Sequence, residues 1–257
     1  MILSVCTAGI SLVVLLLFVC KVVPRIIIKK SRGPFTADET RLFLFVEDVF
    51  VLTYYLTALA YLSINFIGLD FFWEVDISNN GDGNYTKLAQ DSEPFILMNA
   101  FFYFGLLYTL FIRPTRGGNW YELLSHHIIT LAFIYAAYVS LWRVASVWVL
   151  AINIMCDVFV QLSQIAHRAK SWLDIPLFAI LIGLHAYTRL YVFPFRIYET
   201  VSKSFHLFKT PLEHVSYLAA IPLYALWVMW FFKMLMICYK RLWLKEKNND
   251  YAESKVE

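Results

Sequence analysis

Two adjacent histidines, His126 and His127, lie in an apolar stretch of the sequence that continues through Tyr138. Imidazole has an unperturbed pKa near neutrality, so it can transfer protons, attack as a nucleophile or bind a metal. Ionisable side chains are costly inside hydrocarbon, and in membrane helices they often mark functional sites. Both rings could instead serve only as hydrogen-bond partners between helices. The pair is the first candidate for chemistry in this chain.

A second polar group follows at helical spacing. Asn153, Asp157, Gln161 and Gln164 are four, four and three residues apart, which places them on one face of a helix. The amides could simply bond neighbouring helices, whereas a carboxylate in a membrane must be protonated, paired or hydrated. At about 1.5 Å per residue, His127 lies roughly 6 Å and Asp157 roughly 12 Å from the same end of the expected helices. We therefore expect a histidine to contact Asp157, which would fix the imidazole tautomer.

A third group pairs an imidazole with a permanent charge. His185 and Arg189 are one helical turn apart, and arginine stays charged at any ordinary pH. An anionic group must lie near it, and Glu47 and Asp48 are the candidates. Either pairing could be purely structural.

Metal binding is the less favoured interpretation of these side chains. Two histidines and an aspartate form a known ligand set. Adjacent residues, however, project about 100° apart on a helix, so His126 and His127 cannot easily face one ion. We expect no metal site.

The composition shows what must position these residues. The chain has 257 residues, of which 60% are hydrophobic and only 16% charged, so it is too apolar for a soluble domain. A bilayer core requires about 20 apolar residues per helix. Seven runs meet that length, and they predict an all-α polytopic membrane protein: 2–23, 42–69, 94–112, 123–140, 144–165, 175–196 and 214–238.

Charged residues give the expected orientation. The first span lacks a basic segment before it, so we interpret residues 1–32 as a retained signal anchor with a basic stretch rather than a cleaved signal peptide. The positive-inside rule then places the N-terminus in the lumen and the charged tail, 242–257, in the cytosol. The basic residues that fall on that cytosolic side include Lys21, Arg25, Lys29, Lys30, Arg32, Arg113, Arg116, Arg168, Lys170, Lys240 and Arg241.

The remaining loops and cysteines agree with this topology in most respects. An acidic loop from Asp76 to Asp91 carries the glycosylation sequon at Asn84 on the lumenal side, although Lys203 and Lys209 also fall there. The net charge of +3 indicates topology and contact with anionic lipid, not nucleic-acid binding. Four cysteines without paired spacing indicate neither disulfides nor a zinc site.

These residues resemble the TLC-domain proteins, and among them the ceramide synthases (sphingosine N-acyltransferases). The likeness runs from about residue 101 to 197. The Lag motif of that family is matched by His126, His127, Thr130, Tyr138, Asp157 and Leu162, and a later Thr-Arg-Leu-x-x-Phe-Pro-Phe string by residues 188–195. The chain departs from the family pattern in three places: Ile154 replaces the first aspartate of the motif, Asn153 stands where histidine or methionine is frequent, and the charged segment usual before the histidine pair is replaced by residues 114–120.

The resemblance implies a fold and an activity. The fold is a TLC domain, here 33–241, in which six helices form a barrel around a lipid tunnel with the first helix outside. The activity is N-acylation of a sphingoid base in the endoplasmic reticulum membrane, with fatty acyl-CoA as co-substrate and no bound cofactor; a homo- or heterodimer is compatible with it. Catalysis would fall to His126, His127 and Asp157, and substrate binding to Asn153, Arg189, Glu47 and Tyr138.

Two alternatives remain open. The missing aspartate at Ile154 favours a TLC-fold protein that binds, senses or moves lipid without acyl transfer. A seven-helix receptor or transporter is favoured only by the number of spans. The sequence shows no paired half-repeats or broken-helix signals of a transporter.

Overall fold

The computed structural model describes residues 2–30, 39–66, 83–113, 118–139, 143–204 and 211–253. Within these ranges the chain is helical apart from short turns, which confirms the all-α prediction. The elements are α1 (Ile2–Lys30), α2 (Glu39–Asn65), α3 (Gly83–Ile112), α4 (Trp120–Val139), α5 (Arg143–Arg168), α6 (Asp174–His185), the π-helix η3 (Ala186–Val192), α7 (Phe193–Ser204) and α8 (Pro211–Glu253).

The described part of the chain contains six helical segments long and apolar enough to cross a membrane. They are Val5–Val23, Thr40–Asn65, Gln90–Ile112, Ser146–Arg168, Asp174–Glu199 and Leu218–Lys240. The expected span 123–140 corresponds to α4, which is not among the six and carries both histidines. The chain is therefore a polytopic membrane protein.

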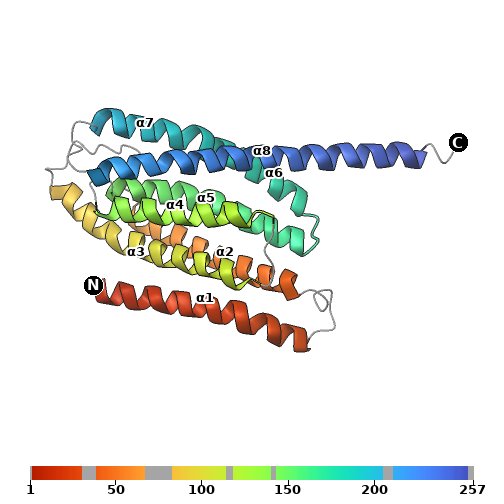
Figure 1. The fold of residues 1–257 in the computed structure, drawn as a ribbon, viewed down its shortest axis with the longest axis horizontal. Helices are drawn as coiled ribbons and strands as arrows, with labels where there is room; N and C mark the ends of the chain where they lie inside the picture. The colour runs from red at the N-terminus through yellow and green to blue at the C-terminus, as the bar shows by residue number, and fades with distance from the viewer. Residues whose placement is uncertain are drawn as a thin grey trace.

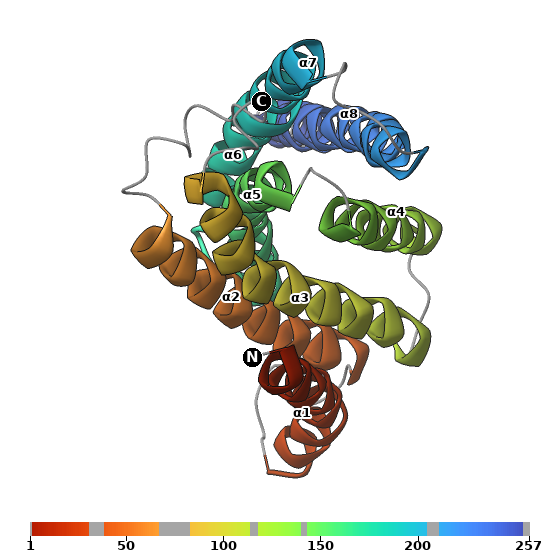
Figure 2. The ribbon, with the colours of Figure 1, turned by 90° about the vertical axis from the view of Figure 1, so that its left-hand side faces the viewer.

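The helices lie side by side in one bundle (Figures 1 and 2). Helix α5 is the most buried of the six candidate spans and packs against α2, α3, α4 and α6. Helix α4 packs between α3 and α8. Since α3, α5 and α8 all contact the histidine-bearing helix, side chains from several elements can meet beside it.

Helix α1 lies on the outside of the bundle against α2 and α3 (Figure 2). Its contact with α3 depends on small residues, as is usual between membrane helices. A Cβ atom on Gly9 would lie 2.2 Å from Cδ2 of Phe101, and one on Gly105 would lie 3.2 Å from Cδ2 of Leu16. The two glycines therefore allow the α1 and α3 backbones to approach closely, and α1 is the extra outer helix that the resemblance implies.

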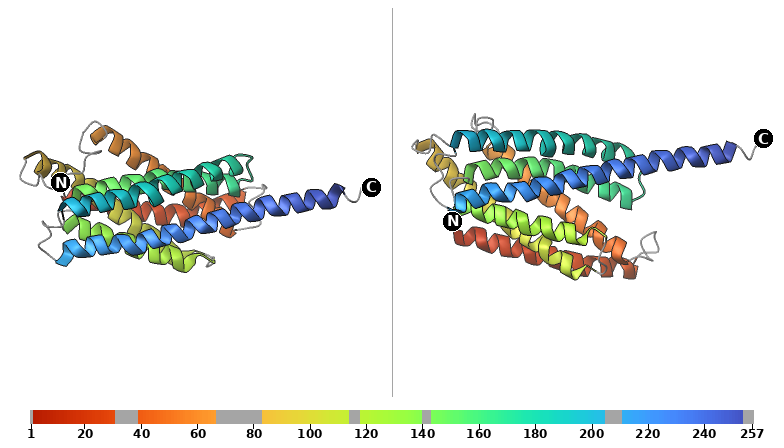
Figure 3. Two further views of the ribbon diagram at one scale, coloured as in Figure 1. Left: turned by 90° about the horizontal axis from the view of Figure 1, so that it is seen from above. Right: turned by 45° about the horizontal axis from the view of Figure 1, so that its top comes forward.

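Two segments that the sequence assigned to loops or tails are partly helical. Helix α3 begins at Gly83, inside the acidic stretch Asp76–Asp91, and α8 continues to Glu253, projecting beyond the bundle (Figures 1 and 3). Residues 67–82 and the side chain of Asn84 lie outside the described residues, as do the side chains from residue 241 onward.

Candidate active site

The two histidines lie on the buried side of α4. Each is 8% exposed, and their ring centroids are 5.4 Å apart. The ring of Trp230, on α8, lies 5.0 Å from that of His126. Both Nδ1 atoms and the hydroxyl oxygen of Thr130, one turn further on, are buried without a hydrogen-bond partner among the described residues. The pair is therefore inside the bundle and available to a ligand.

Tyr103 on α3 packs against both imidazoles. Its ring centroid lies 6.3 Å from that of His126 and 5.9 Å from that of His127, and the residue is 2% exposed. This contact could not be predicted, because Tyr103 stands in an aromatic run where no residue type or spacing distinguishes it.

Arg189 pairs with Asp157. The guanidinium donates from Nη2 to the Asp157 carboxylate and, at 3.5 Å, to the main-chain oxygen of Asn153. Its Cζ atom lies 5.2 Å from the centre of the Trp227 ring, which allows a cation–π interaction. Arg189 is 2% exposed, so its charge is compensated inside the bundle. The predicted contact between a histidine and Asp157 is wrong, because among the described residues the Asp157 carboxylate forms its ion pair with Arg189.

A π-helical turn presents Arg189 to α5 and α8. Pro194 cannot donate a main-chain hydrogen bond, and its ring would clash with the carbonyl four residues earlier in an α-helix. The chain widens instead, and the N–H of Phe193 bonds to the oxygen of Thr188, five residues back. Such widened turns are frequent at functional sites. The residues that match the family string, 188–195, thus form the widened turn and the start of the helix that follows it.

His185 anchors this turn to α8. Its Nε2 lies 3.0 Å from the main-chain oxygen of Trp227, so that nitrogen carries the donated proton. Its Nδ1 then faces the sulfur of Cys156 at 4.0 Å. His185 is 2% exposed and has a structural role beside the Arg189–Trp227 contact.

Several buried polar atoms without partners belong to α4, α5, η3 and α8, which pack against one another. In folded proteins more than nine buried polar groups in ten have a hydrogen-bond partner. In the part of the chain that the structure describes, six buried atoms of this site have none: His126 Nδ1, His127 Nδ1, Thr130 Oγ1, Asn153 Oδ1, Arg189 Nε and Trp227 Nε1. They include donors and acceptors, so a polar ligand group that reaches them finds hydrogen-bond partners.

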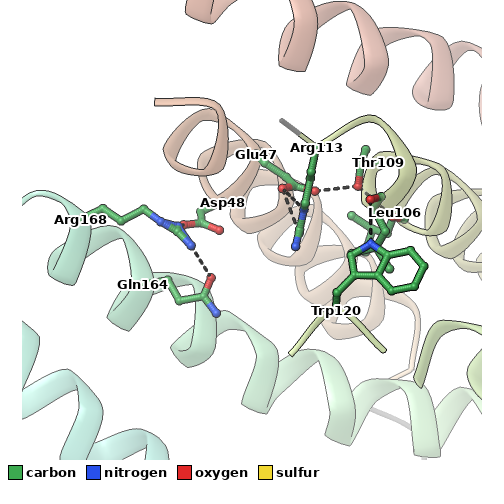
Figure 4. A network of polar contacts seen from close by, with 9 residues as sticks. Glu47, Asp48, Leu106, Thr109, Arg113, Trp120, Gln164 and Arg168 are labelled. Carbon is green, nitrogen blue, oxygen red and sulfur yellow. Dashed lines mark hydrogen bonds and ion pairs between the residues drawn. The ribbon is translucent and has the colours of Figure 1, made fainter. Parts of the chain in front are cut away.

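Glu47 and Asp48 are paired elsewhere (Figure 4). Glu47 accepts from the Thr109 hydroxyl at 2.6 Å and from Arg113 at 3.0 Å, while Asp48 accepts from Arg168 at 2.6 Å. The prediction that either acid neutralises Arg189 is therefore wrong. Both ion pairs join α2 to neighbouring helices at one end of the bundle. Sequence spacing could not choose among these acids, because it gives faces and depths but not the rotation of one helix against another.

Tyr138 lies far along α4 from the histidines. It follows His127 by eleven residues, which is roughly 16 Å of helix. Its hydroxyl donates to Glu93 at 2.6 Å. The structure therefore buries His126 and His127 on α4, joins Asp157 and the Asn153 carbonyl to Arg189, and engages Glu47 and Tyr138 in other contacts. No cluster of three or more histidines, cysteines or acids that could hold a metal occurs within the described ranges.

Comparisons with known proteins agree with the fold. A search of curated proteins finds no match to the chain. The family model of the TLC domain matches residues 40–236, which includes every residue of the site described above and leaves α1 outside. The match covers more than half of the chain, and the protein therefore belongs to the TLC-domain family.

Proposed function

We propose that this protein transfers a fatty acyl group from acyl-CoA to the amine of a sphingoid base. The observation that carries the proposal is the group of unpartnered polar atoms around His126 and His127, enclosed in an apolar helical bundle. A thioester carbonyl and an amine supply the acceptor and donors that such a group can bind. Membership of the TLC-domain family supports a lipid substrate, and the Lag-type spacing supports the ceramide synthase type.

In this reaction each of the two imidazoles has a separate role. One of them, His127 in our assignment, either accepts the acyl group or removes a proton from the attacking amine. On the general-base route the carbon–sulfur bond breaks as the amine nitrogen bonds to the acyl carbon, and the imidazole passes the amine proton to the CoA thiolate. On the covalent route the imidazole nitrogen bonds to the acyl carbon as the carbon–sulfur bond breaks, the amine then displaces the imidazole, and the proton that the amine loses goes to the thiolate. His126 donates toward the oxyanion that develops on the acyl oxygen. Asp157 has an indirect role, which is to hold the Arg189 guanidinium, because its carboxylate is bound to that group.

The same proposal covers location and partners. It places the protein in the endoplasmic reticulum membrane with its N-terminus in the lumen, as the distribution of basic residues favours. Fatty acyl-CoA is a co-substrate, so no resident cofactor is needed. The acyl chain would lie along the apolar interior of the helix bundle.

Purified protein tests the proposal directly. Detergent-solubilised protein given acyl-CoA and sphinganine should form dihydroceramide, measured by mass spectrometry, and His127→Ala and His126→Ala should each abolish the product. The matched control is His167→Ala, because His167 lies at the surface of α5 in an exposed pair with Asp174. Unchanged product formation in both His126→Ala and His127→Ala would refute the assignment.

One observation favours a second function, lipid binding or transfer without catalysis. Ile154, which replaces the first aspartate of the motif, is fully buried in an apolar cluster with Leu150 and Val158. The position thus serves packing and supplies no acid. If wild-type protein forms no dihydroceramide but co-purifies with lipid, and Arg189→Gln loses that lipid, the protein is a binder.

A further inference from the structure

Trp230, on α8, has the shortest ring contact with His126 among the described residues. The two ring centroids are 5.0 Å apart with 62° between the planes, which is an edge-to-face arrangement. The other rings beside His126, those of His127 and Tyr103, lie at 5.4 and 6.3 Å. Nδ1 of His126 has no hydrogen-bond partner among the described residues, so these ring contacts help to set the orientation of the imidazole.

The indole of Trp230 is itself held by a hydrogen bond. Its Nε1 donates to Oε2 of Glu122 at 3.1 Å, and the other carboxylate oxygen of Glu122 accepts from the Lys233 ammonium. Glu122 and His126 are four residues apart on α4 and therefore lie on one face of that helix. Two side chains one turn apart on α4 thus contact the same indole, one through its N–H group and one through its ring.

We propose that Trp230 is a positioning residue for His126, and that Glu122 fixes the orientation of its indole ring. The ring limits rotation of the imidazole, and the hydrogen bond to Glu122 limits rotation of the ring. The ion pair with Lys233 is not required, because the lysine side chain is 50% exposed and exposed ion pairs contribute little. The kinetic part of this inference depends on the proposed acyl transfer, in which His126 stabilises the oxyanion, whereas the structural part does not.

A purely packing role would have a different signature. If Trp230 only filled space, its hydrogen bond to Glu122 would be dispensable. Glu122→Leu removes the acceptor and leaves the indole ring, while Trp230→Phe removes the donor and keeps an aromatic ring. The matched controls are Glu122→Gln and Lys233→Met, because each removes the ion pair and leaves an oxygen at residue 122 that can accept from the indole.

The first measurement needs no activity. Protein labelled with ¹⁵N-histidine is compared in detergent micelles, with the His126 signals assigned from His126→Gln. Glu122→Leu and Trp230→Phe should shift these signals, whereas the two control variants should leave them in place. The signals of His185, whose Nε2 is bonded to a carbonyl of α8, serve as the internal reference and should not move. Wild-type His126 signals in Glu122→Leu, or a shift of His185 as large as that of His126, would overturn the proposal.

The second measurement is a double-mutant cycle on acyl transfer. Glu122→Leu and Trp230→Phe should each lower kcat about tenfold, the order expected for one lost hydrogen bond, with KM nearly unchanged. The double variant should be no slower than the slower single variant, because both changes interrupt one connection. Multiplying effects, about a hundredfold together, or a tenfold loss in Lys233→Met, would contradict the assignment. A wild-type protein that forms no product would refute the proposed function, and the His126 signals would still decide the role of Trp230.

Discussion

Neutralising Asp157 should destabilise the protein far more than neutralising an acid at its surface. Asp157→Asn leaves the Arg189 guanidinium 2% exposed and without its carboxylate. Removing one partner of a buried ion pair costs about 3–5 kcal/mol. The Trp227 ring, at 5.2 Å, and the Asn153 carbonyl remain, so we expect about 3 kcal/mol. Unfolding free energies from denaturant titration in mixed micelles, followed by tryptophan fluorescence, give the value.

The control and the double variant make this expectation specific. Glu199 pairs with Arg196 at 2.7 Å with both side chains 29% exposed, so Glu199→Gln should cost only about 0.2–1 kcal/mol. The Asp157→Leu/Arg189→Met variant removes both buried charges and should recover most of the stability while acyl transfer stays lost. Equal losses for Asp157→Asn and Glu199→Gln, or a double variant as unstable as the sum of its single changes, would show that the ion pair is not a buried, coupled unit.

Two further predictions concern packing. Ile154→Asp, which restores the residue of the family motif, should lower the free energy of unfolding by several kcal/mol, because the site is apolar and fully buried. The control Ile154→Val should lower it by only about 1 kcal/mol. An aspartate variant as stable as the valine variant would show that the site accommodates an acid. Gly9→Leu should weaken the α1–α3 contact and lower the thermal unfolding midpoint, since even a Cβ atom at this position would lie 2.2 Å from Phe101. Ala8→Leu, on the exposed side of α1, should leave the midpoint unchanged. Equal midpoints for the two variants would argue against close packing at Gly9.

Much of the fold could be predicted from the sequence because membranes constrain it strongly. Apolar runs of about 20 residues are hard to explain in any other way, and they correspond to the helices of the structure. Helix ends were less predictable. Gly83 begins α3 inside an acidic stretch with loop-like composition, and α8 continues well past Lys240, because neither end is marked by the length of a hydrophobic run.

The site was only partly predictable for a physical reason. Residue type identified His126, His127 and Arg189, since charged and ionisable groups stand out in hydrocarbon. Partners depend on how helices rotate against one another, and spacing within a helix does not contain that information. The sequence suggested Glu47 and Asp48 as partners of Arg189, whereas the structure joins it to Asp157. Tyr103 could not be singled out, because it is one of 16 tyrosines in the chain and stands in an aromatic run.

The π-helix explains why Arg189 reaches Asp157. Pro194 forces the turn before it to widen, and the extra residue in that turn changes the directions of the side chains that follow His185. His185 bonds to the Trp227 carbonyl while Arg189 lies over the Trp227 ring, so both residues of the turn contact the same position of α8. A regular α-helix would give Arg189 a different rotation relative to His185. Pro194 therefore determines the orientation of Arg189, five residues earlier, and so allows its guanidinium to reach the Asp157 carboxylate.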